Sequence, residues 1–581
     1  MQAYRSFVFA LVLVAMLGCG GASGAEGDTL PARATTHMVV AANPHAAEAG
    51  RRILRAGGGA VDAAIAVQLV LSLVEPQSSG IGGGAFMLYF DHADVDDRTD
   101  VVTAYEGRET APAAASPDMF LGADGEELPG FAANFGGLPV GVPGVMRMLE
   151  AAHADHGRLP WADLFGPAIE LAESGFEVTP RLYFLLDRFA EFARDEAFKK
   201  LYFDANGRAR PTGFKLVNPE YAETLRLLAS RGAQIMYSGP LAEAIVATVR
   251  DNPLGAGRLS LEDMQNYRAH KSEPLCTAYR QWRVCGPQLP SSGGVTVQQV
   301  LGMLAAFDST AIADAQARSI HLIAEASRLA FADRNFYLAD PAFVDAPVAG
   351  LLSKAYLEQR AALIDRNAAM QDVAPGRPAE LVAWNYAPSG FSDIASTSHF
   401  SIVDRWGDGV AMTTSVQSGF GSQLVVGGFI LNNQLTDFSF EPERGGLPVA
   451  NRPEGGKRPL SSMTPTLVFD EEGRLTLLMG SPGGTRIINF VAQALIGVLD
   501  GGQNVQEAVA APHFVAQSGF IELEERTLLL EQTEALEALG HRVGARNLNS
   551  GLHAIEIEYT ESGRVLWGGV DPRREGAALG D

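Results

Sequence analysis

The stretch ASTSHFSIVD, residues 395–404, places three hydroxyl side chains directly before a histidine and a run that predicts a strand. The hydroxyls belong to Ser396, Thr397 and Ser398. Serine and threonine bond readily to their own backbone, so the simplest interpretation is a polar turn that leads into the strand. A chemical role for the cluster requires support from the rest of the chain.

The segment before these hydroxyls, QDVAPGRPAELVAWNYAPSGFSD at residues 371–393, is rich in proline and glycine and has no hydrophobic periodicity. This composition predicts an exposed connection, in which a cut of the chain is tolerated. We therefore expect a processing site close to the point where the hydroxyls gather.

The order of helical and strand-like patterns predicts an α+β fold. Strand-like runs come in adjacent pairs instead of alternating singly with helices, which favours antiparallel sheets covered by helices. Helical patterns lie near 46–55, 60–74, 160–174, 241–250, 315–334, 354–365, 485–500 and 505–511. Strand patterns lie near 86–90, 101–105, 274–279, 282–286, 398–404, 409–415, 429–432, 465–469, 474–479, 553–559 and 565–568.

The composition indicates a large folded protein without a nucleic-acid partner. Of the 581 residues, 47% are hydrophobic, which is ample for a buried core. The net charge of -23 disfavours nucleic acid and anionic membrane surfaces, because binding to them depends on clustered lysine and arginine. No Cys/His cluster or H-E-x-x-H pattern is present, and residues 91–100 lack the glycine of a calcium loop, so we expect neither metal nor cofactor.

The N-terminus has the pattern of an export signal over residues 1–25. Arg5 precedes the apolar run FVFALVLVAML and the small-residue stretch GCGGASGA. The letters MLGC ending at Cys19 resemble a bacterial lipoprotein cleavage site, which would leave a lipid anchor on Cys19, and a cut after Ala25 competes with it. We expect export, either to the bacterial periplasm or to the cell envelope on a lipid. The later apolar run at 60–74 contains Asp62 and predicts a buried helix.

The segment EPLCTAYRQWRVCGP contains the two remaining cysteines, Cys276 and Cys285. A two-residue hairpin turn at Arg280 and Gln281 would set these cysteines directly opposite each other. An oxidising compartment permits a disulfide there, whereas two unpaired buried cysteines remain the alternative.

A glycine run at 80–85, GIGGGA, has the letters of a dinucleotide fingerprint but not its context. A helix precedes the run and a strand follows it, whereas nucleotide binding needs a strand and then a helix. We expect these glycines to allow close packing.

Three further segments supply groups that suit an amino-acid substrate. Gly483 and Gly484 stand between a strand and a helix, where bare backbone N–H groups can stabilise an oxyanion, although a plain turn is the alternative. RPLSSM at 458–463 offers hydroxyls, and LNNQLTDFS at 431–439 offers amides with a carboxylate. Hydroxyls with an arginine would hold a carboxylate, while Asp437 with Gln434 would hold an ammonium.

At this point the chain resembles the gamma-glutamyltransferase family. The resemblance rests on the blocks EPQSSGIGGGAFML, GRETAPAAASPDMF, GLPVGVPGV, LPSSGGV, AEASRLAFADRNFYLADP, TSHFSIVD, LNNQLTDFS, KRPLSSMTPT, GSPGGTRI and DPRREGAA, which cover nearly all the chain after the leader. The resemblance implies an N-terminal-nucleophile hydrolase, a four-layer αββα sandwich of two antiparallel sheets between helical layers. It also implies self-cleavage between Ser396 and Thr397 into a large subunit, 26–396, and a small catalytic subunit, 397–581, which remain together as one folded heterodimer.

The resemblance also implies a mechanism without a cofactor. Thr397 would attack a γ-glutamyl amide such as glutathione, with its freed α-amino group as general base. The glutamyl group would then pass to water or to an amino-acid or dipeptide acceptor. The implied roles are the oxyanion donors Gly483 and Gly484, Ser415 beside the amine, Arg108, Ser461 and Ser462 on the α-carboxylate, and Gln434 and Asp437 on the α-ammonium.

Some features of the chain depart from the family pattern and keep other functions open. Gln417 and Ser415 stand where common bacterial members have asparagine and threonine, and the connection FEPERGGLPVANRPEGG is short. A glutaryl acylase would keep the fold, but Asp437 would then face an uncharged substrate end as an unpaired charge. An enzyme acting on poly-γ-glutamate and a non-catalytic binding lipoprotein are further alternatives.

Overall fold

The computed structural model describes residues 30–92, 102–253, 255–314, 316–379, 381, 383–390 and 396–581. The expected export signal at 1–25, with Cys19, lies outside the described residues. Within the part of the chain that is described, no helix is long and apolar enough to cross a membrane.

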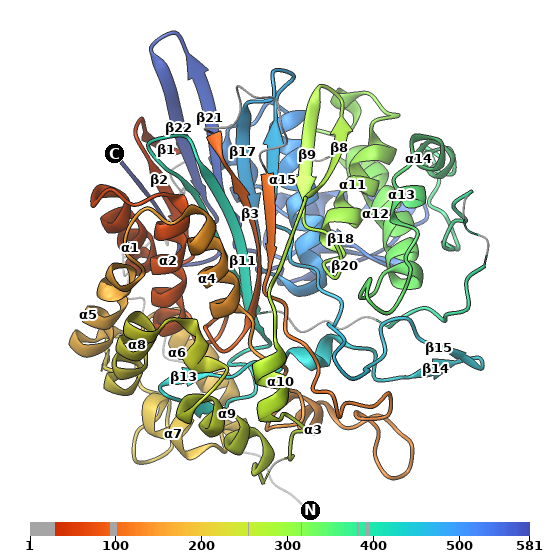
Figure 1. Ribbon diagram of the computed structural model, residues 1–581. Helices are drawn as coiled ribbons and strands as arrows, with labels where there is room; N and C mark the ends of the chain where they lie inside the picture. The colour runs from red at the N-terminus through yellow and green to blue at the C-terminus, as the bar shows by residue number, and fades with distance from the viewer. Residues whose placement is uncertain are drawn as a thin grey trace, which may run out of the picture.

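Two seven-stranded antiparallel sheets form the centre of the molecule (Figure 1). The first, here called the Thr397 sheet, has the order β23 (Ala577–Gly580), β2 (Met38–Ala41), β10 (Ser396–Val403), β11 (Gly409–Gln417), β3 (Gly84–Phe90), β4 (Val102–Glu106) and β7 (His270–Ser272). The second, here called the Gly480 sheet, has the order β1 (Ala32–Ala34), β22 (Gly563–Val570), β21 (His553–Thr560), β17 (Leu475–Gly480), β16 (Thr466–Phe469), β9 (Trp282–Gly286) and β8 (Leu275–Tyr279).

The two sheets pack face to face, and helices cover their outer faces (Figure 1). Leu88 and Val403 of the Thr397 sheet share a buried core with residues of the Gly480 sheet such as Leu478. The outer face of the Thr397 sheet packs against α1 (Pro44–Arg55), α2 (Ala60–Val74), α4 (Val145–His156), α5 (Gly166–Ser174) and α8 (Pro219–Arg231). The outer face of the Gly480 sheet packs against α11 (Gly293–Leu304), α12 (Ala317–Tyr337), α15 (Ile487–Leu499) and α16 (Val505–Ala510). This arrangement confirms the predicted α+β fold and its αββα layers.

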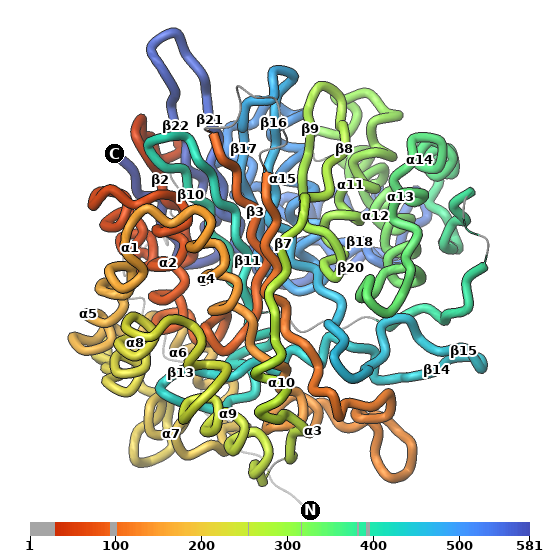
Figure 2. The backbone as a smooth tube through the Cα atoms, viewed as in Figure 1, coloured from red at the N-terminus to blue at the C-terminus, as the bar shows by residue number. Residues whose placement is uncertain are grey.

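Segments from distant parts of the sequence alternate within the Thr397 sheet. β10 pairs with β2 on one side and with β11 on the other, and β11 pairs with β3. Figure 2 shows these strands running side by side, although β2 and β3 belong to the first hundred residues. A cut before Thr397 would therefore leave its strand clamped between strands of the other fragment.

Helix α2 confirms the predicted buried helix and gives a role to its one charged residue. All its residues are buried, and Asp62 lies in its first turn. The Asp62 carboxylate accepts hydrogen bonds from the backbone N–H groups of Gly59 and Leu159, at 2.9 and 3.1 Å. Asp62 therefore satisfies one donor at the start of the helix and one in the loop after α4, which an apolar residue cannot do.

The predicted helix and strand positions agree with the structure to within a few residues over most of the chain, but several elements escaped prediction. Helix α11 begins with two glycines, carries β-branched residues and is buried on nearly all sides, so it has no clear amphipathic period. The strand pattern near 429–432 is confirmed at Phe429–Ile430, and Gln434–Asp437, farther along LNNQLTDFS, form a short 3₁₀ helix, η6, that was not predicted.

The hairpin of β8 and β9 has the predicted register. Cys276 pairs directly with Cys285, and the turn lies between Tyr279 and Trp282. The structure joins the two cysteines by a disulfide, with their Cα atoms 4.1 Å apart.

The glycine run at 80–85 brings backbone segments into close contact, as predicted. A Cβ atom on Gly82 would lie 2.1 Å from the carbonyl oxygen of Ile430, and one on Gly83 would lie 2.1 Å from that of Ser415. Neither position can accept a side chain unless backbone moves. The run therefore allows β11 and the end of β13 (Phe429–Ile430) to pack directly against the start of β3.

Replacement of Gly83 by alanine should destabilise the protein, because the new methyl group meets backbone that cannot rotate away. We expect a loss of about 1–3 kcal/mol in the free energy of unfolding, measured by denaturant titration. Gly80→Ala is the matched control in the same loop, since its nearest contacts would be ordinary ones at 3.6 Å or more. Equal losses in the two variants would contradict this account.

Candidate active site

Thr397 lies at the start of β10, opposite an irregularity in the neighbouring strand. Ser396 pairs with Gln417 and Ser398 pairs with Thr414, so Ser415 and Val416 together face Thr397. Such a bulge bends the strand and redirects its side chains. Gln417 has a φ of 85°, a left-handed conformation that is rare for a residue with a side chain.

The bulge brings two hydroxyl groups onto one carbonyl oxygen. The Thr397 Oγ1 atom lies 2.7 Å from the carbonyl oxygen of Ser396, and the Ser415 Oγ atom lies 2.7 Å from the same oxygen. The two hydroxyl oxygens are 3.2 Å apart. Donors at this carbonyl polarise the Ser396–Thr397 peptide bond, the bond at which the resemblance implies cleavage.

Buried polar contacts hold Thr397 from behind. The Arg574 guanidinium donates to the carbonyl oxygen of Thr397 at 2.9 Å and to that of Ser550 at 2.6 Å. On the next residue, the Ser398 hydroxyl accepts from the Ser79 hydroxyl at 3.1 Å. These contacts come from both ends of the chain, and they restrict the position of the Thr397 backbone.

Thr397 opens onto a pocket that gathers most of the predicted site residues. Ser415, Gln417, Gln434, Asp437, Ser461, Ser462 and Gly484 line this pocket, with Arg334, Ser389, Gly390, Asn451, Leu460, Met463, Thr485 and Ile487. Three predicted site residues, Arg108, Ser396 and Gly483, are not in the lining. The structure therefore brings most of the predicted residues together around one pocket.

The turn Gly483-Gly484 has the geometry that an anion-binding loop requires. It joins β17 to α15 through the short helix η7 (Gly484–Arg486). Both glycines have left-handed φ values, 141° and 59°, and a Cβ on Gly483 would lie 2.7 Å from the Phe490 ring. Among the described residues, neither backbone N–H has a hydrogen-bond acceptor, so both remain available to a ligand.

Asp437 carries the carboxylate of the pocket, and its oxygens are already well supplied with donors. The Arg108 guanidinium donates to Oδ2 at 2.6 Å, and the side-chain amide of Gln434 donates to the same oxygen at 3.0 Å. The Gln417 amide donates to Oδ1 at 3.0 Å. The Asp437 side chain is nevertheless 23% exposed and faces the pocket.

Arg108 lies against Asp437 and is fully buried. Besides Asp437, its guanidinium donates to the backbone carbonyl oxygens of Pro459 and Leu460, at 3.0 and 3.2 Å. Its remaining Nη1 atom has no hydrogen-bond partner in the described parts of the chain and lies 3.7 Å from Glu109. In this structure Arg108 thus fixes Asp437 and the segment before Ser461 instead of facing the pocket.

The arginine that lines the pocket is Arg334, which was not among the residues predicted from the sequence. It belongs to α12 and donates to the hydroxyls of Ser292 and Ser462, each at 2.9 Å. Burial lowers the pKa of Arg334 to about 10, which leaves the side chain charged at neutral pH. It lies within the quoted block AEASRLAFADRNFYLADP, but nothing in the sequence indicates that this helix reaches Ser462.

Asn451 is a second pocket residue that was not predicted from the sequence. Its side-chain amide donates to the Asp437 carbonyl oxygen at 2.7 Å, and its Oδ1 atom accepts from the Leu460 N–H at 3.0 Å. It therefore holds the short connection between Asp437 and Ser461 in place. Phe440 at the start of this connection stacks on Phe120, with ring centroids 4.4 Å apart.

Comparison with known proteins gives one family along most of the chain. The family model described as Gamma-glutamyltranspeptidase matches residues 46–581. A glutathione hydrolase proenzyme of Bacillus subtilis (strain 168) is 34% identical over 556 residues, which cover 94% of this chain and 91% of the relative.

Two acylases are also similar to the chain. The Acylase ACY 1 proenzyme of Pseudomonas sp. (strain V22) is 35% identical over 554 residues, covering 92% of this chain and 93% of the relative. The crystal structure of cephalosporin acylase from Bacillus halodurans superposes with a TM-score of 0.82 at 28% identity, covering 95% of this chain and 97% of that chain. On the match over residues 46–581 and these identities, the chain belongs to the gamma-glutamyltranspeptidase family.

Proposed function

We propose that this protein is a self-processing enzyme that cleaves γ-glutamyl amides such as glutathione and passes the glutamyl group to water or to an amino-acid or dipeptide acceptor. One observation carries the proposal: the Thr397 hydroxyl lies 2.7 Å from the carbonyl oxygen of the preceding residue, in a pocket lined by Asp437 and Arg334. Family membership and relatives named glutathione hydrolase proenzyme support it.

Self-cleavage begins with attack of the Thr397 Oγ1 atom on the carbonyl carbon of Ser396. The C–N bond to Thr397 breaks as an ester to Oγ1 forms, and the nitrogen gains a proton to become an α-amino group. Water then hydrolyses the ester and leaves a carboxylate on Ser396. Ser415 stabilises the developing oxyanion, because its hydroxyl already lies 2.7 Å from that oxygen.

The freed threonine supplies both the nucleophile and the base for turnover. An α-amino group has a pKa of about 7.7–8.0, so near neutral pH it accepts the hydroxyl proton as Oγ1 attacks the substrate amide. The N–H groups of Gly483 and Gly484 stabilise the tetrahedral oxyanion. The leaving amine takes up the proton, and water or an acceptor amine then attacks the acyl-enzyme.

The charged ends of the pocket suit the head group of a glutamyl substrate. Asp437, with the amide oxygen of Gln434, would hold the α-ammonium, and Ser461, Ser462 and Arg334 would hold the α-carboxylate. Arg108 lies outside the pocket lining and orients Asp437 and the carbonyls of Pro459 and Leu460.

A glutaryl acylase is the second candidate function. It is supported by the Arg108–Asp437 ion pair, because Asp437 does not need a substrate ammonium as its partner. The expectation that Asp437 would be an unpaired charge in front of a glutaryl group was wrong. Arg108 and two side-chain amides already bond the carboxylate without a substrate ammonium. The similarity to a cephalosporin acylase structure agrees with this candidate.

Export completes the proposal. The leader at residues 1–25 supports release to the bacterial periplasm or attachment through Cys19, and the disulfide of Cys276 and Cys285 is compatible with an oxidising compartment.

Glu109 adds a pH-sensitive charge beside Arg108. Its side chain is fully buried, and neither carboxyl oxygen has a hydrogen-bond partner in the described chain. Burial raises the pKa of Glu109 to about 8, although the nearby Arg108 guanidinium opposes this shift. Glu109 is therefore largely protonated at neutral pH.

Thr397→Ala should leave the precursor uncut and inactive, because hydroxyl and latent amine belong to one residue. Thr397→Ser should still mature in part. A denaturing gel with mass spectrometry would show one chain for Thr397→Ala and fragments that meet at 396/397 for the wild type. Thr485→Ala removes another pocket hydroxyl and should mature normally; cleavage at 396/397 in Thr397→Ala would refute the mechanism.

Asp437→Asn should distinguish the two candidate substrates. Loss of a charge-assisted bond to the ammonium costs about 1.5–3 kcal/mol, or roughly 10- to 100-fold in kcat/KM, on a γ-glutamyl anilide. A glutaryl anilide has no ammonium, so it should lose only the smaller cost of the weakened contact to Arg108, which both donors share. Glu441→Gln changes an exposed acid on the same connection and serves as the control. Equal losses on both donors would indicate that Asp437 only supports the structure.

Glu109→Gln should flatten the dependence of stability on pH. In the wild type the folded pKa of about 8 lies above the ordinary value of 4.5, so the native state binds an extra proton between these values. Stability should therefore fall as pH rises from about 4.5 to about 8 and then level off. The neutral amide of Glu109→Gln does not titrate, so the Tm of the variant should fall less between pH 5 and pH 8 than the Tm of the wild type. An equal fall in Tm for the two proteins would contradict the prediction.

A further inference from the structure

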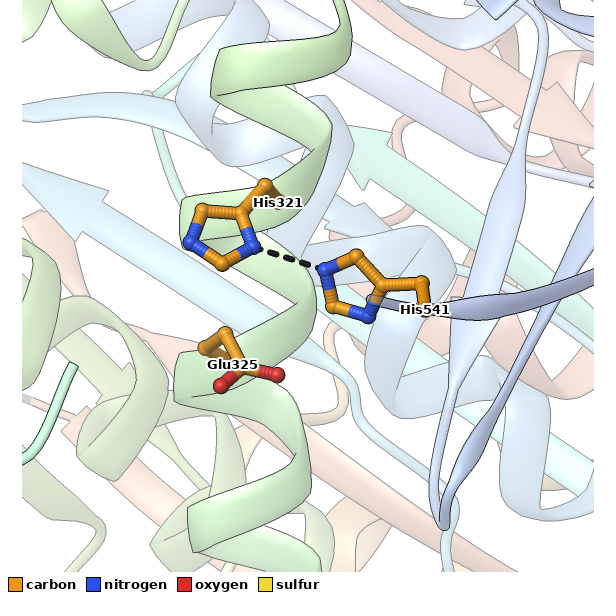
Figure 3. A group of neighbouring side chains, drawn as sticks. All are labelled: His321, Glu325 and His541. Carbon is orange, nitrogen blue, oxygen red and sulfur yellow. Dashed lines mark hydrogen bonds between the residues drawn. The ribbon is translucent and has the colours of Figure 1, made fainter. Parts of the chain in front are cut away.

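Two histidines and a glutamate form a cluster beside α12 (Figure 3). None of the three residues lines the proposed catalytic pocket. His321 and Glu325 are one helical turn apart on the same face of α12, and His541 reaches them from just before β20 (Arg542–Arg546). All three residues are buried, and each offers a ligand atom within 4.8 Å of the others.

The hydrogen bonds of His321 prepare one of its nitrogens for a metal ion. Its Nε2 atom lies 2.7 Å from the carbonyl oxygen of Asp365, so this nitrogen must carry the proton and donate. Its Nδ1 atom is then the unprotonated acceptor, 2.7 Å from Nε2 of His541. A histidine ligand commonly has this arrangement, with the second nitrogen bonded to a backbone carbonyl.

Glu325 is held in a similar way. Arg328 donates to one carboxylate oxygen, and the Met370 N–H donates to the other at 2.8 Å. A carboxylate has about four lone-pair positions, so these two bonds orient it and leave positions free toward the histidines. The Arg328 guanidinium is thus a positive charge in direct contact with the Glu325 carboxylate.

We propose that His321, Glu325 and His541 bind one divalent transition-metal ion of the zinc class. Imidazole nitrogens with one carboxylate are a ligand set that Zn²⁺ accepts, whereas Mg²⁺ and Ca²⁺ prefer oxygen ligands alone. On binding, the two facing nitrogens separate from 2.7 Å to roughly 3.3 Å, the spacing of a tetrahedral site with bonds of about 2.0–2.1 Å. His541 loses the Nε2 proton and binds as its Nδ1–H tautomer.

The ion has a structural role at this position. His321 is thirteen residues before Arg334 on the same helix, which corresponds to roughly 20 Å along its axis. The ion therefore lies far from the catalytic pocket. After cleavage before Thr397, which rests on the proposed function, α12 and His541 would belong to different fragments, and the ion would link them.

The test uses untagged protein that has been dialysed against a chelator and returned to buffer. Calorimetric titration with Zn²⁺ should show one binding site per chain, and added Zn²⁺ should raise the Tm of the protein. Mg²⁺ should neither bind at this site nor raise the Tm. Co²⁺ bound to the wild-type protein should show the intense visible absorption of a four-coordinate ion. The calorimetric, Tm and absorption measurements can all be made on the uncut Thr397→Ala chain, so failure of self-cleavage does not affect them.

His541→Ala should weaken Zn²⁺ binding by more than about 100-fold, since loss of an outer partner alone typically costs about 10- to 100-fold. His321→Ala should do the same, and His270→Ala, an exposed histidine outside the cluster, should bind like the wild type. The proposal is overturned if the wild type binds no Zn²⁺, or if folded His541→Ala and His321→Ala proteins keep the wild-type affinity.

Discussion

The bulge between β10 and β11 is the feature on which the proposed chemistry depends. A regular ladder would set one residue of β11 opposite Thr397, whereas here Ser415 and Val416 share that place. The extra residue brings the Ser415 hydroxyl onto the carbonyl oxygen of Ser396 and turns Gln417 toward Asp437. Gly83 packs directly against the carbonyl oxygen of Ser415, so close packing maintains the conformation of the bulge. The strained φ of Gln417 is compatible with such support.

The charge arrangement around the pocket follows from burial. Arg108 is fully buried and would be costly without a partner, and Asp437 supplies one at 2.6 Å. The pair leaves Asp437 oriented toward the pocket, with two amides completing its hydrogen bonds. A substrate ammonium would add to this network instead of replacing it. The substrate preference therefore depends on how much an added ammonium strengthens a carboxylate that is already paired.

The fold allows the chain to be cut without separating its parts. β10 lies between β2 and β11, and Arg574 from the C-terminal segment holds the carbonyl of Thr397. The same interleaving brings His541 to α12. Cleavage before Thr397 removes one covalent bond but none of these contacts, so the active site and the proposed metal site can both persist in the cleaved protein.

The fold class, most strands and helices and the Cys276–Cys285 register could be predicted from the residues, and the family resemblance added most of the residues that gather around Thr397. These features are local, because they depend on periodicity, turn residues and short motifs. The three-dimensional packing was needed to show that Arg108 contacts Asp437 from outside the pocket lining, that Arg334 lines the pocket, and that His321 and Glu325 meet His541. Each of these contacts joins residues that are far apart in the sequence, and such contacts are set by how helices and sheets pack, which no short stretch of sequence encodes.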